Sequence, residues 1–182
     1  MLLGTRTTIE AGVHREGLER RGIDSRRIAA VSCHGLAGAI ERDVDGPRTA
    51  DLIGECIARA AEAAPPGGTV FLGLCCTHYG YVAARLTDSV ARQTSRLVLA
   101  LDPNGQLTSS LLADAGFFEA ACEAPAAAVA PGATAAGTVS VDLVSKVALP
   151  DLARAGIARL VAPVSAVTAD ALLSYAHVPD LF

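Results

Sequence analysis

Short apolar runs alternate with amphipathic stretches along the first hundred residues of the chain. Four runs have the length of buried strands, and three stretches carry apolar residues at helical spacing. The runs lie at residues 1–4, 28–33, 69–74 and 97–101, and the stretches at 7–21, 49–64 and 79–93. Strands that are apolar on both faces and separated by helices are typical of a parallel sheet covered on both sides. The predicted fold class is therefore α/β.

The helix predicted at 49–64 has the clearest pattern. Its apolar stripe consists of Leu52, Ile53, Cys56, Ile57, Ala60 and Ala61. The run Pro65-Pro66-Gly67-Gly68 ends it, because proline and glycine continue a helix poorly. A loop rich in Asp, Gly and Pro is expected before this helix, and a turn at Asp102-Pro103-Asn104-Gly105 is expected to close the strand 97–101.

The composition of the chain changes after Gly116, and this change predicts three regions. Residues 1–115 form the α/β domain, and 116–137 read as a linker of Ala, Pro and Gly. Residues 138–182 form a tail of unclear packing, with a strand at 138–144 and helices at 151–160 and 168–175.

The composition of the chain argues against several classes of protein. Hydrophobic residues make up 51% of the 182, enough for a sizeable core. The net charge of −4 argues against a nucleic-acid or anionic-membrane surface, and no run reaches the ~18 apolar residues of a membrane span. Eight arginines in the first 48 residues are interleaved with seven acids, which predicts a solvated, nearly neutral helix face.

The cysteines number five: Cys33, Cys56, Cys75, Cys76 and Cys122. Their odd number and irregular spacing favour neither a zinc site nor a secreted disulfide framework. We therefore expect reduced thiols in a cytoplasmic protein, with no metal and no cofactor. Cys56 and Cys122 are predicted to be structural.

The sequence Cys75-Cys76-Thr77-His78-Tyr79 contains the clearest candidates for reactive side chains. It follows a predicted strand and opens a predicted helix, and ligands of open α/β sheets bind at the carboxyl ends of strands. Strand alternation points Cys75 away from Cys76, so Cys75 reads as a small buried hydrophobe. A thiolate at Cys76, favoured by a helix N-terminus and by His78, suits nucleophilic attack or proton abstraction beside a carboxylate.

Two other strand ends carry polar groups. Cys33-His34-Gly35-Leu36 follows the strand 28–33, and Glu41 lies seven residues beyond His34, as a candidate carboxylate at the same edge. Gly4-Thr5-Arg6-Thr7-Thr8 offers hydroxyl and N–H groups to an anion but lacks the spacing of a phosphate loop.

These segments resemble glutamate racemases. Leu72–Tyr79 is similar to the family's G-C-T-H-Y-P motif, and residues 4–8 are similar to its G/A-T-x-x-T strand end. Cys33 to Glu41 resembles its C-P-x-L…x-E segment, and Asp102-Pro103 its D-P. The resemblance covers about residues 1–115 and implies one flavodoxin-like lobe of the aspartate/glutamate racemase fold.

The resemblance implies a cofactor-independent racemase that interconverts L- and D-glutamate for cell-wall peptidoglycan. In this family two cysteines on opposite faces of the α-carbon exchange the proton. By motif, Cys76 is one of them, His78 and Glu41 assist it as catalytic residues, and Thr77 holds the substrate carboxylate. Thr5 and Thr8 are the remaining expected substrate-binding residues.

The family's opening D-S-G-x-G-G and its C-N-T segment with the first cysteine have no counterpart in the sequence. The chain therefore corresponds to the second lobe, and a tail beyond Gly116 would have no first lobe to pack on. A truncated chain, a separate first lobe and a divergent lobe are the three explanations. The start of the chain directly in a strand at Met1 favours the first. The expected partners are a small-molecule amino acid and either a separate first lobe or further copies in a homo-oligomer.

Three alternatives stay open. One is a thiol hydrolase built on Cys76, His78 and Glu41, although His78 is so close in sequence that its approach to Cys76 is expected to be difficult. Another is a module that binds small acids without catalysis. The third is a racemase or isomerase of the same superfamily that acts on aspartate, hydantoin or maleate.

Overall fold

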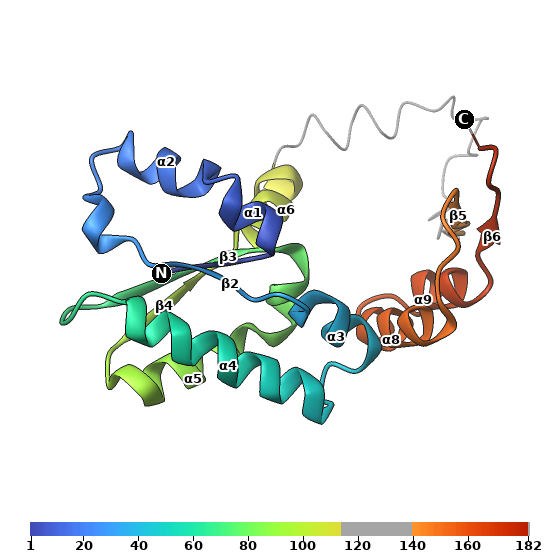
Figure 1. The fold of residues 1–182 in the computed structure, drawn as a ribbon. Helices are drawn as coiled ribbons and strands as arrows, with labels where there is room; N and C mark the ends of the chain where they lie inside the picture. The colour runs from blue at the N-terminus through green and yellow to red at the C-terminus, as the bar shows by residue number, and fades with distance from the viewer. Residues whose placement is uncertain (114–139, 182) are drawn as a thin grey trace, which may run out of the picture.

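The computed structural model describes residues 1–113 and 140–181 of the chain. A four-stranded parallel sheet lies at its centre, with the strand order β2-β1-β3-β4. Its strands are β1 (Leu2–Gly4), β2 (Ala30–Ser32), β3 (Val70–Cys75) and β4 (Val98–Leu101). Helices lie on both faces of the sheet, so the predicted α/β class with a parallel sheet is confirmed (Figure 1).

The helices connect the strands and extend into the tail (Figure 1). They are α1 (Arg6–Glu10), α2 (Val13–Glu19), α3 (Leu36–Arg42), α4 (Pro47–Ala63), α5 (Ala83–Thr94), α6 (Pro103–Ala113), α8 (Asp151–Val161) and α9 (Ala166–Leu173), with the 3-10 helices η1 (Ser25–Arg27) and η2 (Thr77–Val82). A separate pair of short parallel strands, β5 (Val144–Ser145) and β6 (Ala176–His177), lies in the tail.

The main core lies between the sheet and the helices α4 and α5. The predicted stripe of α4 is buried at Leu52, Ile53, Cys56, Ile57 and Ala60. It meets buried side chains of β3 and α5, namely Leu72, Leu74, Leu86 and Val90. We call this side of the sheet the covered face. Alternation along the strands turns Phe71, Leu99 and Leu101 to the other side, which we call the open face.

Several element boundaries differ from the sequence prediction for local reasons. The helix predicted at 7–21 is two helices, because Gly12 between them adopts a left-handed φ of 69°. The predicted turn at 102–105 instead begins α6. The Asp102 carboxylate accepts the Asn104 N–H at 3.0 Å, and proline suits the first turn of a helix.

Other differences concern the loops and the tail. The loop predicted before α4 contains the helix α3, and the helix predicted at 79–93 starts as η2. The strand predicted at 138–144 is absent from residues 140–143, and β5 begins only at Val144. The helices predicted at 151–160 and 168–175 correspond to α8 and α9. The predicted linker at 116–137 and Cys122 lie outside the described residues.

The tail, which was expected to have no first lobe to pack on, packs on the α/β domain itself through α8. A Cβ added at Gly156 would overlap the backbone carbonyl of Glu41 and would lie 3.0 Å from the carbonyl oxygen of Arg42. The Arg159 guanidinium donates to the same Arg42 carbonyl at 3.3 Å. Glycine at position 156 therefore permits the close approach of α8 to the end of α3.

Candidate functional site at the carboxyl edge of the sheet

Three neighbouring strands end at one edge of the sheet. In the register, Gly4 of β1 pairs with Ser32 of β2 on one side and with Cys75 of β3 on the other. The chain leaves β1 into α1 over the open face and leaves β3 toward α5 on the covered face (Figure 1). This change of side between neighbouring strands is where ligands of doubly wound sheets bind.

Cys76, His78 and Glu41 form one cluster at this edge. The Nε2 atom of His78 lies 2.8 Å from Oε1 of Glu41, which is near the end of α3. The Nδ1 atom of the same ring lies 3.8 Å from Sγ of Cys76. The His78 and Glu41 side chains are about a third exposed, at 30% and 32%, so a ligand can reach them.

The partners of His78 indicate which of its ring nitrogens carries a proton. When Glu41 is ionised, Nε2–H of His78 donates to it and Nδ1 is left facing the Cys76 thiol. The Thr77 hydroxyl also lies 3.3 Å from Nδ1 and can donate to it. Transfer of the Cys76 proton to Nδ1 would create a thiolate beside an imidazolium that Glu41 stabilises. His78 therefore contacts Cys76, although its position two residues away in the sequence was expected to make this approach difficult.

Cys76 is not at the start of a long helix, as the sequence prediction placed it. The six-residue η2 follows it, and α5 begins only at Ala83. The N-terminus of a long helix therefore does not lie at Cys76, and the side chain that contacts its thiol is that of His78.

Tyr79 is a further residue of the site, and the sequence analysis gave it no role. Its side chain is fully buried, and its hydroxyl donates to the carbonyl of Cys33 at 3.2 Å. Burial raises the pKa of this hydroxyl, so it stays a neutral donor. Tyr79 thus fixes η2, which carries His78, to the end of β2. Its place in the T-H-Y motif was the available signal.

The threonines predicted to bind substrate have different surroundings. The Thr5 hydroxyl lies 2.8 Å from that of Thr8 and accepts the Thr8 N–H at 3.3 Å, so Thr5 caps α1. Thr77 is exposed and contacts His78. Ser32, at the same edge, has a buried hydroxyl without a hydrogen-bond partner among the described residues. The structure leaves the substrate-binding role of all three threonines a prediction.

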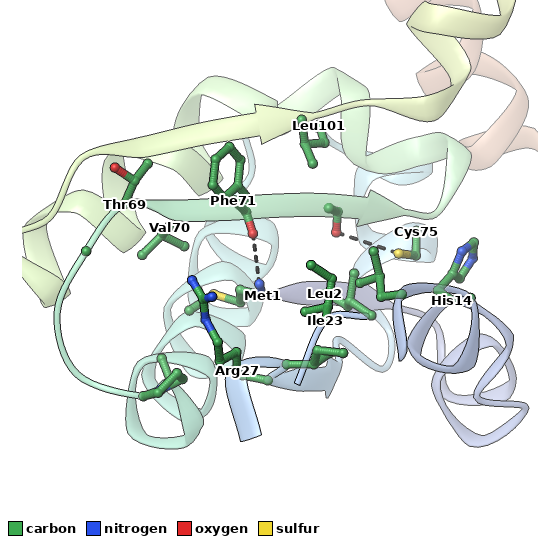
Figure 2. Close-up of a pocket in the computed structure, with 18 of the residues that line it drawn as sticks. Met1, Leu2, His14, Ile23, Arg27, Thr69, Val70, Phe71, Cys75 and Leu101 are labelled. Atoms are coloured by element: carbon green, nitrogen blue, oxygen red, sulfur yellow. Dashed lines mark hydrogen bonds between the residues drawn. The ribbon is translucent and has the colours of Figure 1, made fainter. Parts of the chain in front are cut away.

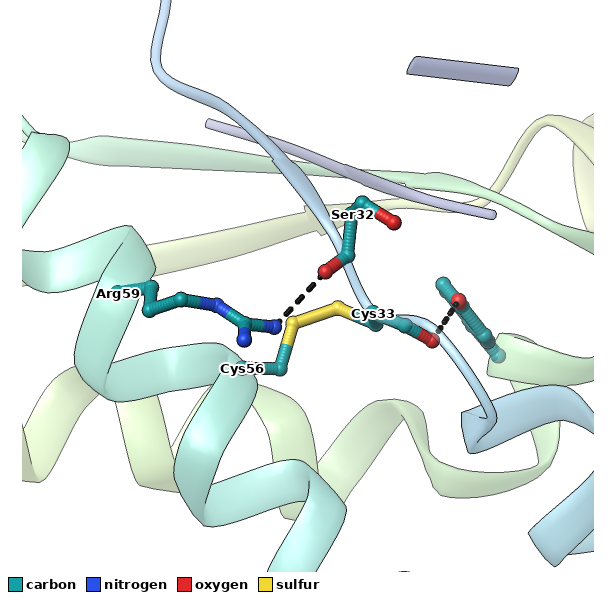
Figure 3. Close-up of a disulfide and its surroundings, with 5 residues drawn as sticks. Ser32, Cys33, Cys56 and Arg59 are labelled. Carbon is teal, nitrogen blue, oxygen red and sulfur yellow. Dashed lines mark hydrogen bonds between the residues drawn. A yellow bond between two sulfur atoms is a disulfide. The ribbon is translucent and has the colours of Figure 1, made fainter. Parts of the chain in front are cut away.

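Cys33 and Cys56 are joined by a disulfide between the end of β2 and the buried face of α4 (Figure 3). Their Cα atoms lie 5.3 Å apart, a usual separation for a disulfide. Beside it, the Arg59 guanidinium donates to the Ser32 carbonyl at 2.8 Å (Figure 3). The prediction of free thiols is therefore wrong for these two residues, because folding places a strand end against a helix 23 residues away.

Cys75 and Cys76 are free thiols, and they face different surroundings. Cys75 lines a cavity on the open face, whereas Cys76 packs against the main core and contacts His78. The prediction that the two point apart agrees with this placement, but Cys75 is only partly buried. Burial raises the pKa of the Cys75 thiol.

Within residues 1–113 and 140–181, no group of three or more His, Cys, Asp or Glu side chains could hold a metal ion. No helix in the same ranges has the length and apolarity to cross a membrane. Comparison of the chain with protein-family models, with curated proteins and with solved structures finds no match.

Proposed function

We propose that the chain is one lobe of an amino-acid racemase in which Cys76 transfers the α-proton of glutamate. The observation that carries the proposal is the contact of Cys76 with His78 and of His78 with Glu41 at the edge where β1, β2 and β3 end. The motifs shared with glutamate racemases support the choice of substrate.

The geometry of the cluster supports the following route for the proton. His78 holds the proton of Cys76, and the resulting thiolate takes the α-proton of the amino acid. The C–H bond breaks, an S–H bond forms, and the electron pair passes into the substrate carboxylate as an enediolate. The hydrogen on sulfur exchanges with solvent, and return of a solvent-derived hydrogen to the same face restores the starting enantiomer. This half-reaction therefore exchanges the α-proton with solvent without inversion.

Inversion needs a second proton donor on the opposite face of the α-carbon. Among the described residues the other free thiol is Cys75, which lines the cavity on the open face. We propose that a first lobe, which the resemblance implies for this family, supplies the second donor. The proposed role is the synthesis of D-glutamate for peptidoglycan in the cytoplasm.

The cytoplasmic assignment has its own test, because the reducing cytosol does not maintain most disulfides. The chain would be isolated from whole cells that produce it naturally, under acid quench, and alkylated before reduction. Mass spectrometry of the peptides would then show whether Cys33 and Cys56 are alkylated. Alkylation of both supports the cytoplasm, and protection of both argues for an oxidising compartment.

The α-proton exchange tests the proposed reaction directly. The chain would be incubated in D2O with L-glutamate and with D-glutamate, and the α-proton signal followed by NMR. We expect wash-out from one enantiomer, abolished in Cys76→Ala and lowered about 10²-fold or more in His78→Gln. Cys75→Ala is the matched control and should keep the exchange.

Exchange that persists in Cys76→Ala would contradict the proposal. Binding of glutamate without exchange would favour the alternative of a module that binds small acids. Aspartate, hydantoin and maleate in the same assay test the other substrates of the superfamily.

A thiol hydrolase is the second candidate, because Cys76, His78 and Glu41 also have the order of a Cys–His–carboxylate triad. In that reaction the thiolate attacks an ester carbonyl, and the alcohol leaves with the proton held by His78. A p-nitrophenyl ester would then give a burst of nitrophenol and an acyl mass increment on Cys76. A burst together with no α-proton exchange would favour the hydrolase over the racemase.

A further inference from the structure

A cavity of about 1110 Å³ lies between the open face of the sheet and the segment that contains α2 and η1 (Figure 2). Phe71 and Leu101 of the sheet line it, and Val13 and Ile23 line it from the other side. These four apolar side chains remain between 40% and 61% exposed. The volume is slightly above the range of about 300–1,000 Å³ that is typical of sites for small organic molecules.

The charged residues that line this cavity are all basic. They are Arg20, Arg21, Arg27 and Arg96, with His14 beside them, and no lining residue is Asp or Glu. The acids that alternate with these arginines in the sequence are thus absent from the lining. An apolar cavity with this charge favours a molecule that has an apolar body and a negative head.

Arg27 is the arginine best placed to receive that head. The Arg96 guanidinium already donates to the carbonyls of Gly68 and Pro65, and Arg20 pairs with Glu16 at 3.6 Å. The Arg27 guanidinium makes no hydrogen bond or ion pair with another described residue, and has only a longer-range attraction to Asp24. Figure 2 shows its side chain extending alongside Met1 toward the cavity.

We propose that this cavity binds a carboxylate amphiphile of the fatty-acid type. The alkyl chain would lie on Phe71, Leu101, Val13 and Ile23, and Arg27 would bind the carboxylate, as a guanidinium does with two parallel hydrogen bonds. A second copy of the chain fits this surface less well, because docking of two such faces would bring their arginines together. The site is distinct from the Cys76 cluster and does not depend on the proposed reaction.

Binding would be measured by displacement of the fluorescent amphiphile 1-anilinonaphthalene-8-sulfonate with decanoate. Decanol and decyltrimethylammonium have the same chain length and serve as neutral and cationic controls. We expect decanoate to displace the probe at least about tenfold more strongly than either control. A series from octanoate to dodecanoate should tighten by up to about fourfold per methylene.

Arg27→Glu should weaken decanoate binding about tenfold or more, and Arg27→Gln less than that. Arg92→Glu is the matched control, because Arg92 is an exposed arginine on α5, across the sheet from the cavity, and its replacement changes the net charge equally. We expect it to leave the affinity unchanged. Thermal melts of the three variants verify that each is folded.

Cys75 provides a second, local readout because its side chain lines the same cavity. Decanoate should slow the alkylation of Cys75 by N-ethylmaleimide, followed by peptide mass spectrometry, and should leave Cys76 unprotected. Equal displacement by decanol, an unchanged affinity in Arg27→Glu, or an unprotected Cys75 would each overturn the proposal. Selective displacement by decanoate, loss of affinity in the Arg27 variants but not in Arg92→Glu, and protection of Cys75 would together support it.

Discussion

The two faces of the sheet are built from the same strands but are packed very differently. On β3, Val70, Leu72 and Leu74 are at most 4% exposed on the covered face, whereas Phe71, between two of them, is 54% exposed on the open face. On β4 the open-face residue Leu99 is 44% exposed. Strands that are apolar on both faces therefore do not by themselves secure packing on both.

The helices explain the difference. The 17-residue α4 presents a continuous apolar stripe to the covered face and packs beside α5. On the other side, α1 and α2 have five and seven residues, are separated at Gly12 and contain no buried residue. Short helices without a buried stripe cannot fill the space over the strands, so a cavity remains there.

The largest expected effect is a difference in the free energy of unfolding between substitutions on the two faces. Leu72→Ala on the covered face should lower the free energy of unfolding by about 2–5 kcal/mol, because it leaves a void among fully buried side chains. Leu99→Ala, on the open face, removes a side chain of the same kind and should cost less than about 1 kcal/mol. Urea unfolding of the two variants measures both. Equal losses would show that the open face is packed as tightly as the covered one.

A smaller effect tests the contact that the tail makes with α3. Gly156→Ala should destabilise the chain by about 1–3 kcal/mol, because the added methyl group overlaps the Glu41 carbonyl. Gly54→Ala is the matched control inside α4, where a Cβ meets no atom within 4 Å, and should stabilise by up to about 1 kcal/mol. Stabilisation by both substitutions would contradict the close approach of α8. Thermal unfolding of the pair is the measurement.

The smallest expected effect is a difference in alkylation rate between the neighbouring thiols Cys75 and Cys76. Burial raises the pKa of Cys75, so its thiolate forms at higher pH than that of an ordinary cysteine. At pH 8, iodoacetamide should therefore modify Cys75 several-fold more slowly than a cysteine in a short peptide, and the rate should still rise above pH 9. Cys76 should react faster than Cys75 because His78 can accept its proton. Peptide mass spectrometry against time measures both rates, and a faster Cys75 would contradict this assignment.

The amino-acid sequence is sufficient to predict the four strands of the main sheet, the α/β class and the buried stripe of α4. These follow from short-range patterns, in which apolar runs and helical spacing report burial directly. It also selected Cys76, His78 and Glu41, because each follows a strand that was predicted to end at the same edge of the sheet. Gly12 and the Asp102-Pro103 start of α6 are local signals as well, but each is compatible with more than one backbone conformation.

The contacts between distant groups depend on the tertiary structure. It places Glu41 2.8 Å from His78, joins Cys33 to Cys56, and brings Gly156 against the end of α3. It also gathers Arg20, Arg27 and Arg96 around one cavity and leaves the interleaved acids out of its lining. These contacts join residues that are far apart in the chain, and their formation depends on strand order and on the approach of helices. Local spacing constrains neither, because the same apolar pattern is compatible with several ways of packing the helices on a sheet.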